Sequence, residues 1–282
     1  MGFKEDDLID LDPPSPKPSE PKPKKTLVLR LINVPSRAEE KSCCPPCSKP
    51  RILLLHLDNC WPFEIYQSLF DILKKTYQLD ERGSGKDAAA YLKACGVDAP
   101  RAVLALDEGV PEDGSKAMFK ALRKYIKQGG TLIMGFHMTV WGLARKDEMT
   151  IRVKKMEKVF QQLGVTWELA CPGDYELWEY TNGIINHQCT NLPHTSAYLS
   201  EFPKQNRFKC LPVKVREEGE ILYHREACKE YSAYNESRHM EAVVACKRIH
   251  DGAVWWIGQS IEGEVLNTMV LRLIGLNISW DD

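Results

Sequence analysis

The sequence lacks an apolar run long enough to cross a membrane. No apolar stretch approaches the roughly 20 residues that a membrane-spanning helix needs. The opening residues, MGFKEDDLID, are acidic where a secretory signal is basic and then apolar. The expected location is therefore the cytoplasm, with the nucleus as the alternative. In that setting the ten cysteines are expected to be reduced thiols rather than a disulfide framework.

An excess of charge of one sign is also missing. The chain has 38 Lys and Arg against 39 Asp and Glu, a formal net charge of -1, so no overall field favours nucleic acid or an anionic membrane. Gly83–Gly85 and Gly129–Gly130 lack both the G-x-G-x-x-G spacing and the Lys-Ser/Thr ending of phosphate-binding loops. We expect no nucleic-acid partner, no membrane partner and no cofactor.

A complete metal-binding motif is missing as well. Structural zinc sites use four ligands, usually in two closely spaced pairs, whereas Cys43, Cys44 and Cys47 form only half of such a motif. The cysteines and histidines between residues 187 and 228 have no spacing that fixes their mutual distances. We therefore assign no metal ligands. The minor alternatives are a zinc or redox site at Cys43–Cys47 and a soft-metal site in the later segment.

Composition divides the chain into a tail and a folded body. In residues 1–50, proline alternates with Lys and Ser, a composition that favours extended chain and cannot form a core. We expect a largely disordered, Pro-rich tail there. Within it, Thr26–Val34 is apolar, β-rich and long enough to add as an edge strand on this protein or on a partner. The favoured interpretation is a short element packed on its own domain. Residues 51–282 are expected to form one domain.

Apolar runs of strand length alternate with helical patterns from residue 51 onward. The helical patterns are amphipathic, and the helix after Gly83 begins with the capping box Ser84–Asp87. Strand–helix alternation at this spacing predicts an α/β fold with a parallel, right-handed wound sheet. The expected strands are 52–57, 102–106, 131–135 and 166–170, and the expected helices are 62–73, 84–95, 115–128 and 146–163.

Residues 172–240 break this pattern. They hold four prolines and four of the seven histidines but no long periodic stretch, which is more typical of a cap or binding insertion than of a plain loop. Order returns with strands at 242–246 and 253–257, joined by the hairpin signal His250–Gly252. A terminal helix is expected over residues 259–276.

The order of these elements resembles the class I glutamine amidotransferase-like superfamily, and within it the ThuA-like (trehalose-utilisation-like) branch. The likeness is carried by Gly129–Gly130 before a strand ending Gly135-Phe136-His137, and by the late hairpin Asp251–Gly258 with the helix after it. It covers about residues 51–170 and 240–276. The resemblance implies a flavodoxin-like three-layer αβα sandwich with a mostly parallel central sheet, here with a loop-rich insertion at about 172–240. It implies no single activity.

The chain departs from the amidotransferase pattern at the catalytic positions. Class I amidotransferases carry a catalytic Cys after this central strand and a His-x-Glu pair after a late strand. Here Phe136-His137 and Gln259–Glu262 stand at those places. Glutamine hydrolysis needs a thiolate paired with an imidazole base, so these departures argue against ordinary glutaminase activity. A different hydrolase activity stays open.

Polar side chains follow three of the predicted strands. Because the carboxyl ends of parallel strands meet at one edge of a sheet, these side chains are expected to share a rim where ligands bind. A histidine beside a carboxylate can act as a general base, which makes His137 and Glu108 the candidate catalytic residues. The alternative is that the rim groups cap helices and bind water. The expected binding residues are His56, Asp58, Asn59, Asp107 and Trp141.

Two functions follow from this arrangement. In the first, a ThuA-like protein binds or hydrolyses a small molecule at the strand-end cleft, with His137 as general base or ligand contact and Glu108 or Asp58 orienting it. In the second, a catalytically inactive amidotransferase-like scaffold binds another protein through its Pro-rich tail and Thr26–Val34.

Overall fold

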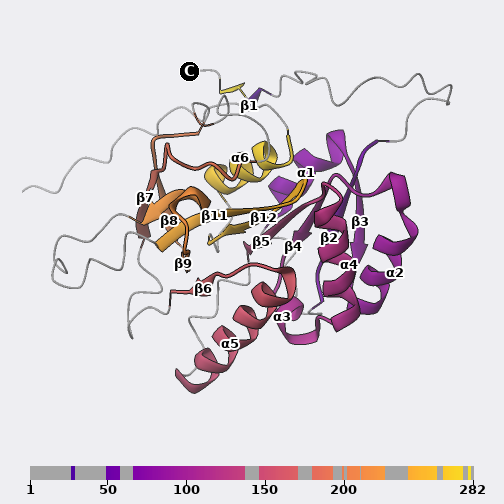
Figure 1. Cartoon of the computed structure of the whole chain (residues 1–282). Helices are drawn as coiled ribbons and strands as arrows, with labels where there is room; N and C mark the ends of the chain where they lie inside the picture. The colour runs from indigo at the N-terminus through magenta and orange to yellow at the C-terminus, as the bar shows by residue number, and fades with distance from the viewer. Residues whose placement is uncertain are drawn as a thin grey trace, which may run out of the picture.

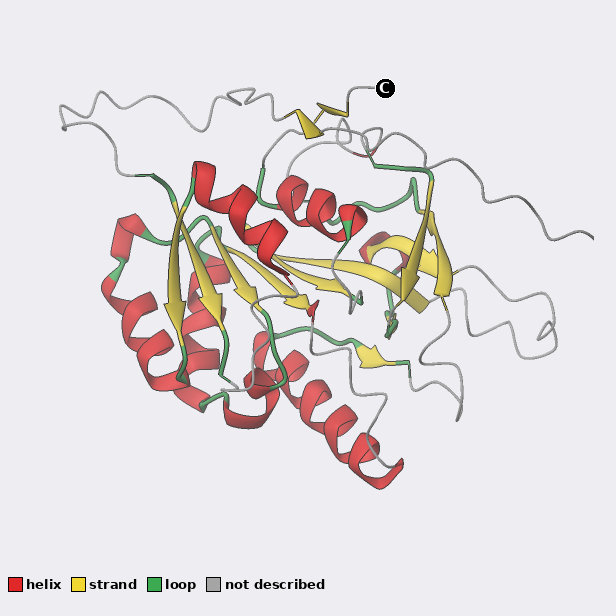
Figure 2. Cartoon of the chain, turned by 180° about the vertical axis from the view of Figure 1, so that it is seen from behind, coloured by secondary structure: helices red, strands yellow, loops and turns green. Residues whose placement is uncertain are grey.

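The computed structural model shows an α/β fold built on one large sheet. Eleven strands form a mixed sheet, and helices cover both of its faces (Figures 1 and 2). The structure describes residues 27–28, 49–57, 66–136, 146–170, 180–192, 199, 202–209, 211–225, 241–258, 263–275 and 279–280.

One half of the sheet is parallel. Its strands lie in the order β3 (Gln78–Arg82), β2 (Arg51–Leu55), β4 (Ala102–Ala105), β5 (Thr131–Gly135) and β12 (Gly252–Ile257), and each runs parallel to its neighbours within this set. The continuous apolar runs of β2, β4, β5 and β12 are buried, as central strands covered on both faces require. The prediction that the 52–57 and 131–135 segments lie parallel in one sheet is confirmed, because both pair with β4.

The other half is antiparallel. From β12 the sheet continues through β11 (Glu241–Ile249), β10 (Ile221–Arg225), β7 (Tyr180–Ile185) and β8 (Gln205–Lys209). Two short strands lie beside this path: β9 (Val213–Lys214) pairs with β11, and β6 (Glu168–Leu169) pairs with β9. The sheet is therefore mixed, with parallel pairing confined to five strands, and a mostly parallel sheet is not confirmed.

The difference arises in the segment that was expected to be a loop-rich insertion. Its described residues supply β7, β8, β9 and β10, which lengthen the sheet. These strands are short, and β7 buries Gly183 and Ile185 while exposing Asn182 and Ile184. They therefore lack the continuous apolar run that identifies a fully covered strand. β6 forms where a strand was expected, but it pairs antiparallel with β9 instead of extending the parallel set.

Helices pack on both faces because successive strand residues point to opposite sides. On one face Leu54, Leu104 and Trp255 belong to a buried apolar cluster with residues of α1 (Gln67–Thr76) and α6 (Glu264–Leu273). On the other, Leu53 and Val103 belong to a second cluster with residues of α2 (Gly85–Ala94), α4 (Lys116–Lys127) and α5 (Lys146–Leu163). Figure 2 shows α1 and α6 lying across the sheet on the side toward the viewer. The described residues also form the short helix α3 (Gly109–Asp113) and 3-10 turns at Gly96–Asp98 and Glu218–Glu220.

Local signals place the ends of α2 and α4 within one residue of the prediction. The Ser84 side chain accepts a hydrogen bond from the Asp87 backbone N–H and caps α2, and Ser115 caps α4 by accepting from the Met118 N–H. After α4 the chain reverses at Gly129, whose φ of 100° favours glycine. The helices near 84–95 and 115–128 are therefore confirmed. Within the described residues, no helix is both long and apolar enough to cross a bilayer.

A separate two-stranded sheet involves the tail. β1 (Leu27–Val28) pairs antiparallel with β13 (Ser279–Trp280). The described part of the 26–34 segment thus pairs with late residues of its own chain. The other residues of the tail before Lys49 lie outside the described residues.

A buried carboxylate ties the antiparallel half to the residues after α5. Glu220 is completely buried, and its Oε2 accepts a hydrogen bond of 2.6 Å from Trp167 Nε1. Its Oε1 forms an ion pair with Lys247 Nζ on β11. Both oxygens of this carboxylate are therefore satisfied, as a buried charge requires.

Replacing Glu220 with Ala should lower the free energy of unfolding by about 3 kcal/mol, because Trp167 and Lys247 lose a buried partner. Glu217 also pairs with Lys247, at 3.4 Å, but its side chain is 67% exposed. Glu217→Ala should therefore cost less than about 1 kcal/mol. Urea denaturation measures both variants, and equal losses would contradict this assignment.

Candidate functional site

The parallel strands end along one edge of the sheet. The register places Leu55 of β2 beside Ala105 of β4, Ala105 beside Met134 of β5, and Gly135 beside Ile257 of β12. In Figure 2 the arrowheads of these strands point toward the lower side of the molecule. The residues that follow each strand are therefore brought to this edge. Of the expected site residues, His56, Asp107 and Glu108 are described there, whereas Asp58, Asn59, His137 and Trp141 lie outside the described residues.

Asp107 joins the ends of two strands. Its side chain is 1% exposed, and its Oδ1 accepts hydrogen bonds of 3.1 Å from the backbone N–H groups of Leu57 and Gly109. One carboxylate oxygen thus connects the residues after β2 to the start of α3. These hydrogen bonds give Asp107 a structural role at the edge.

Glu108 and His56 both have charged partners that the sequence did not indicate. Glu108 forms an ion pair with Arg152 of α5, and the two side chains are 27% and 31% exposed. His56 Nε2 lies 3.7 Å from Glu81 Oε2 on β3. Arg152 and Glu81 carry no motif, and only the packing of α5 and the pairing of β3 bring them to this edge.

The backbone makes a sharp turn at the end of β5. Gly135 has a φ of 123°, and a Cβ there would lie 1.9 Å from the Ile257 carbonyl oxygen, so only glycine fits beside β12. Phe136 has a φ of 50°, which is rare for a bulky residue. Its buried ring packs edge-on against Tyr66, with ring centroids 5.6 Å apart. In α/β hydrolases a strained strand-to-helix turn of this kind carries the nucleophile, but here it carries a buried phenyl group.

Two of the three described thiols are also poorly suited to nucleophilic attack. Burial raises the pKa of the Cys189 thiol to about 11 and holds the pKa of Cys246 well above its ordinary value. Cys246 Sγ also donates a hydrogen bond to the Asn191 carbonyl. The third described cysteine, Cys95, follows α2. None of the three follows the carboxyl end of a parallel strand, so the described residues contain no amidotransferase-type thiol.

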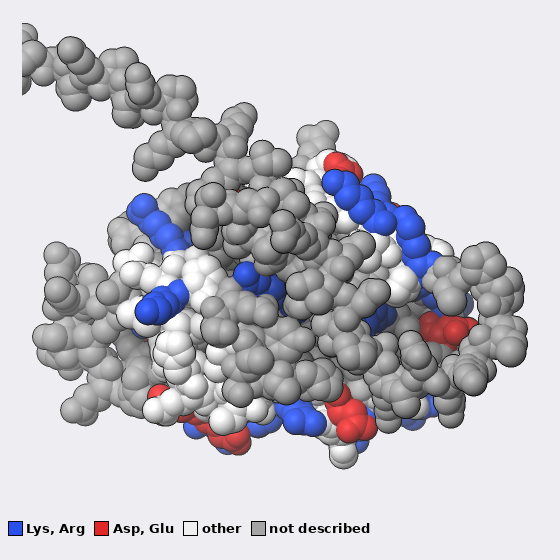
Figure 3. Space-filling view, turned by 90° about the horizontal axis from the view of Figure 1, so that it is seen from above, with Lys and Arg blue, Asp and Glu red and all other residues white. Residues whose placement is uncertain are grey.

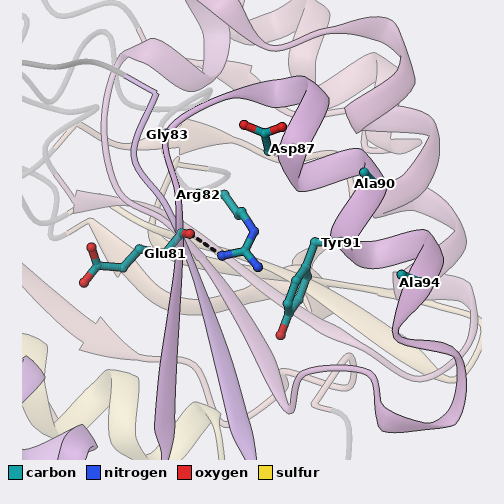
Figure 4. Close-up of a pocket in the computed structure, with 7 residues that line it drawn as sticks. All are labelled: Glu81, Arg82, Gly83, Asp87, Ala90, Tyr91 and Ala94. Atoms are coloured by element: carbon teal, nitrogen blue, oxygen red, sulfur yellow. Dashed lines mark hydrogen bonds between the residues drawn. The ribbon is translucent and has the colours of Figure 1, made fainter.

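An open groove of about 530 Å³ lies between β3 and α2. Figure 4 shows the Arg82 guanidinium over the Tyr91 ring, while Glu81 points away. Tyr91 donates a hydrogen bond to Asp80, and Arg82 donates one to the Glu81 carbonyl. The polar groups of this groove are thus largely paired with one another. Small-molecule pockets are usually more enclosed and more apolar than this groove. The lining residues are Glu81, Arg82, Gly83, Asp87, Ala90, Tyr91 and Ala94.

Among the described residues, no group of three or more side chains forms a metal-binding cluster.

Comparison with known proteins gives only distant structural likenesses. No family model and no curated protein matches the sequence. A β-galactosidase from Bacillus circulans sp. alkalophilus is 11% identical, with a TM-score of 0.44 over 80% of this chain and 31% of that chain. A ThuA-like protein from Parabacteroides merdae is 10% identical, with a TM-score of 0.47 over 83% and 93% of the two chains. The cytoplasmic protein STM1381 from Salmonella typhimurium LT2 is 11% identical, with a TM-score of 0.41 over 79% and 92%.

This chain spans about a third of the length of the β-galactosidase chain. At these identities and TM-scores the likenesses assign neither an activity nor a site residue to it.

Asp107→Ala should lower the free energy of unfolding by about 2–4 kcal/mol, because two buried backbone N–H groups lose their acceptor. Asp107→Asn keeps an acceptor oxygen in the same place and should cost under about 1.5 kcal/mol. Chemical denaturation compares the two variants. If both cost the same, the negative charge rather than the hydrogen bonding of Asp107 would be the stabilising feature.

The buried thiols should resist alkylation while the protein is folded. With a pKa of about 11 for Cys189, only on the order of one thiol in a thousand is ionised at pH 8, and the thiolate is the reactive form. Iodoacetamide labelling resolved by peptide mass spectrometry should modify Cys95 well before Cys189 or Cys246. In urea the three should react alike. Fast labelling of Cys189 in the folded protein would contradict its burial.

Proposed function

We propose that this chain is a ThuA-like protein that binds a small molecule at the carboxyl edge of β2, β4, β5 and β12 and hydrolyses it, with His137 as the general base. The observation that carries the proposal is the left-handed backbone at Phe136, directly before His137 at the end of a central parallel strand. Ligands of open α/β sheets bind at this edge.

The strained turn supports a functional role because it costs free energy. A non-glycine residue with left-handed backbone costs about 1–2 kcal/mol. Such strain persists where surrounding contacts impose it, and it is concentrated at active sites and ligand-binding sites. Here the Tyr66–Phe136 ring contact and the close approach of Gly135 to Ile257 impose it. In the proposal, this turn directs His137 out of the sheet edge.

The neighbouring strand supplies the charged groups for the reaction. β4 lies directly beside β5, so Glu108 and His137 follow adjacent strands, which are about 4.8 Å apart. We assign Glu108 to orient the imidazole. Arg152, paired with Glu108, would stabilise negative charge that develops on the substrate. Asp107 would maintain the shape of the edge, and His56, Asp58, Asn59 and Trp141 would contact the ligand.

Without a nucleophilic side chain at the turn, the nucleophile in this proposal is water. His137 would accept a proton from a water molecule as the water oxygen bonds to an electrophilic carbon of the ligand. The bond from that carbon to its leaving oxygen or nitrogen then breaks, and the imidazolium of His137 returns the proton to the leaving group. This kind of assistance contributes about 10²–10⁴-fold in rate. The class of reaction is therefore direct hydrolysis without a covalent enzyme intermediate. The described residues provide no observation that favours the protein-interaction alternative.

His137→Ala should lower kcat/KM by at least about 10²-fold on the best substrate of a panel of small esters, lactones, amides and glycosides. His187→Ala is the matched control, because His187 is exposed and follows β7. β7 runs opposite to β12 and therefore ends at the other edge of the sheet, so this variant should keep full activity. The proposal fails if the wild-type chain hydrolyses no member of the panel. It also fails if His137→Ala retains wild-type kcat/KM.

A further inference from the structure

The exposed face of α4 carries only positive charge. Seen from above, the surface of the molecule shows Lys and Arg in several separate groups and fewer Asp and Glu (Figure 3). α4 contains no acidic residue, and its basic residues recur at helical spacing, so they share one face. We call this face the basic stripe. It consists of Lys116, Lys120, Arg123, Lys124 and Lys127, all exposed.

The basic stripe has no partner among the described residues. Cations of the neighbouring helix α5 do have partners: Arg152 pairs with Glu108 and Lys155 with Glu112. No ion pair or side-chain hydrogen bond within the described part of the chain involves a cation of the basic stripe. The nearby carboxylates Glu108 and Glu112 are therefore already paired with α5.

Folding does not require this arrangement. α4 is held to the sheet by its apolar face, which includes Met118, Leu122 and Ile126. Like charges four residues apart destabilise a helix by about 0.2–0.5 kcal/mol per pair. Lys116, at the first position of α4, also meets the positive end of the helix dipole. A solvated face of mixed charge would avoid both costs, so the basic stripe is better explained by an anionic partner.

We propose that the partner is Glu5–Asp12 of the same chain. This segment, EDDLIDLD, has five carboxylates and no cation in eight residues, the highest density of acidic residues in the sequence. Its five negative charges match the five positive charges of the basic stripe. The near-zero net charge of the chain thus includes two opposite groups that are far apart in the sequence.

The position of the tail makes this contact geometrically feasible. Residues 13–48 connect the acidic segment to Lys49, which precedes β2. α4 ends at Lys127, just before β5, and β2 and β5 both flank β4 in parallel. The tail therefore enters the body at the edge where α4 ends. Because Leu27–Val28 pairs with Ser279–Trp280, residues 13–26 set the length available to the acidic segment. At about 3.3 Å per extended residue they reach on the order of 45 Å, more than the roughly 16 Å that α4 spans between Lys116 and Lys127.

Connectivity favours this partner over a separate polyanion. Each exposed ion pair contributes less than about 1 kcal/mol, so a separate acidic peptide would bind weakly. A tethered segment binds with an effective concentration in the millimolar range. The basic stripe also has no interleaved aromatic residue for stacking on nucleic-acid bases. The contact is independent of the hydrolytic function proposed above.

Zero-length carbodiimide cross-linking of the full chain tests this contact directly, because it joins carboxylates to lysines that touch. Peptide mass spectrometry should find Glu5–Asp12 joined to Lys116, Lys120, Lys124 and Lys127. The yield should fall at least about fivefold near 1 M salt, where the Debye length is about 3 Å. In a mixture of ¹⁴N- and ¹⁵N-labelled protein, the linked peptides should carry the same label, as an intramolecular contact requires.

A pair of matched variants tests the contribution of charge. Lys120→Gln/Lys124→Gln should reduce cross-linking at the remaining Lys116 and Lys127 at least threefold. Lys74→Gln/Lys75→Gln is the control, because these exposed lysines lie on α1, over the opposite face of the sheet, and it should leave the yield unchanged.

Three results would overturn the proposal. The first is the absence of cross-links from Glu5–Asp12 to the basic stripe, and the second is a yield that salt does not change. The third is binding of duplex DNA or of anionic vesicles through the basic stripe with the same affinity before and after neutralisation of Glu5, Asp6, Asp7, Asp10 and Asp12. That result would make a nucleic acid or a lipid surface the partner.

Discussion

The pairing of β5 with β12 is the constraint on which the rest of the structure depends. It joins residues 131–135 to residues 253–257 in parallel register, and through it the parallel strands near the start of the body meet the antiparallel strands of the later chain. The pairing is close enough at Gly135 that a Cβ would collide with the Ile257 carbonyl. The same close approach begins the turn that ends β5. The integrity of the sheet and the position of the candidate site are thus determined at one place.

The residues around that place have two kinds of role. Asp107 and Phe136 are buried and hold the backbone, one through hydrogen bonds to N–H groups and the other through ring packing. Glu108 and Arg152 are partly exposed and paired, so they remain accessible to a ligand. This division suits a site in which a rigid edge positions a small number of reactive groups. It also explains why a turn without a nucleophile can keep a strained backbone.

Much of the fold could be predicted from the sequence, and the failures have a common physical cause. β2, β4, β5 and β12 are continuous apolar runs because both faces of each strand are covered, and Ser84 and Ser115 mark helix starts through local hydrogen bonds. β3 was not predicted, because its sequence Gln-Leu-Asp-Glu-Arg is that of an exposed edge strand. β7 to β10 were missed because they are short and partly exposed, and their pairing is set by partners distant in the sequence.

The edge of the sheet where the candidate site residues lie could be predicted from strand direction alone. The charged partners Glu81 and Arg152 could not, because they depend on side-chain packing that the sequence does not encode locally.

A crystal structure of the full chain that shows His137 would test the central claim most directly. The account predicts that the turn after Phe136 places the imidazole at an open cleft, with one ring nitrogen about 3 Å from the carboxylate of Glu108 or from a water held there. An imidazole packed in an apolar environment, with no opening at the carboxyl edge of β5, would contradict it.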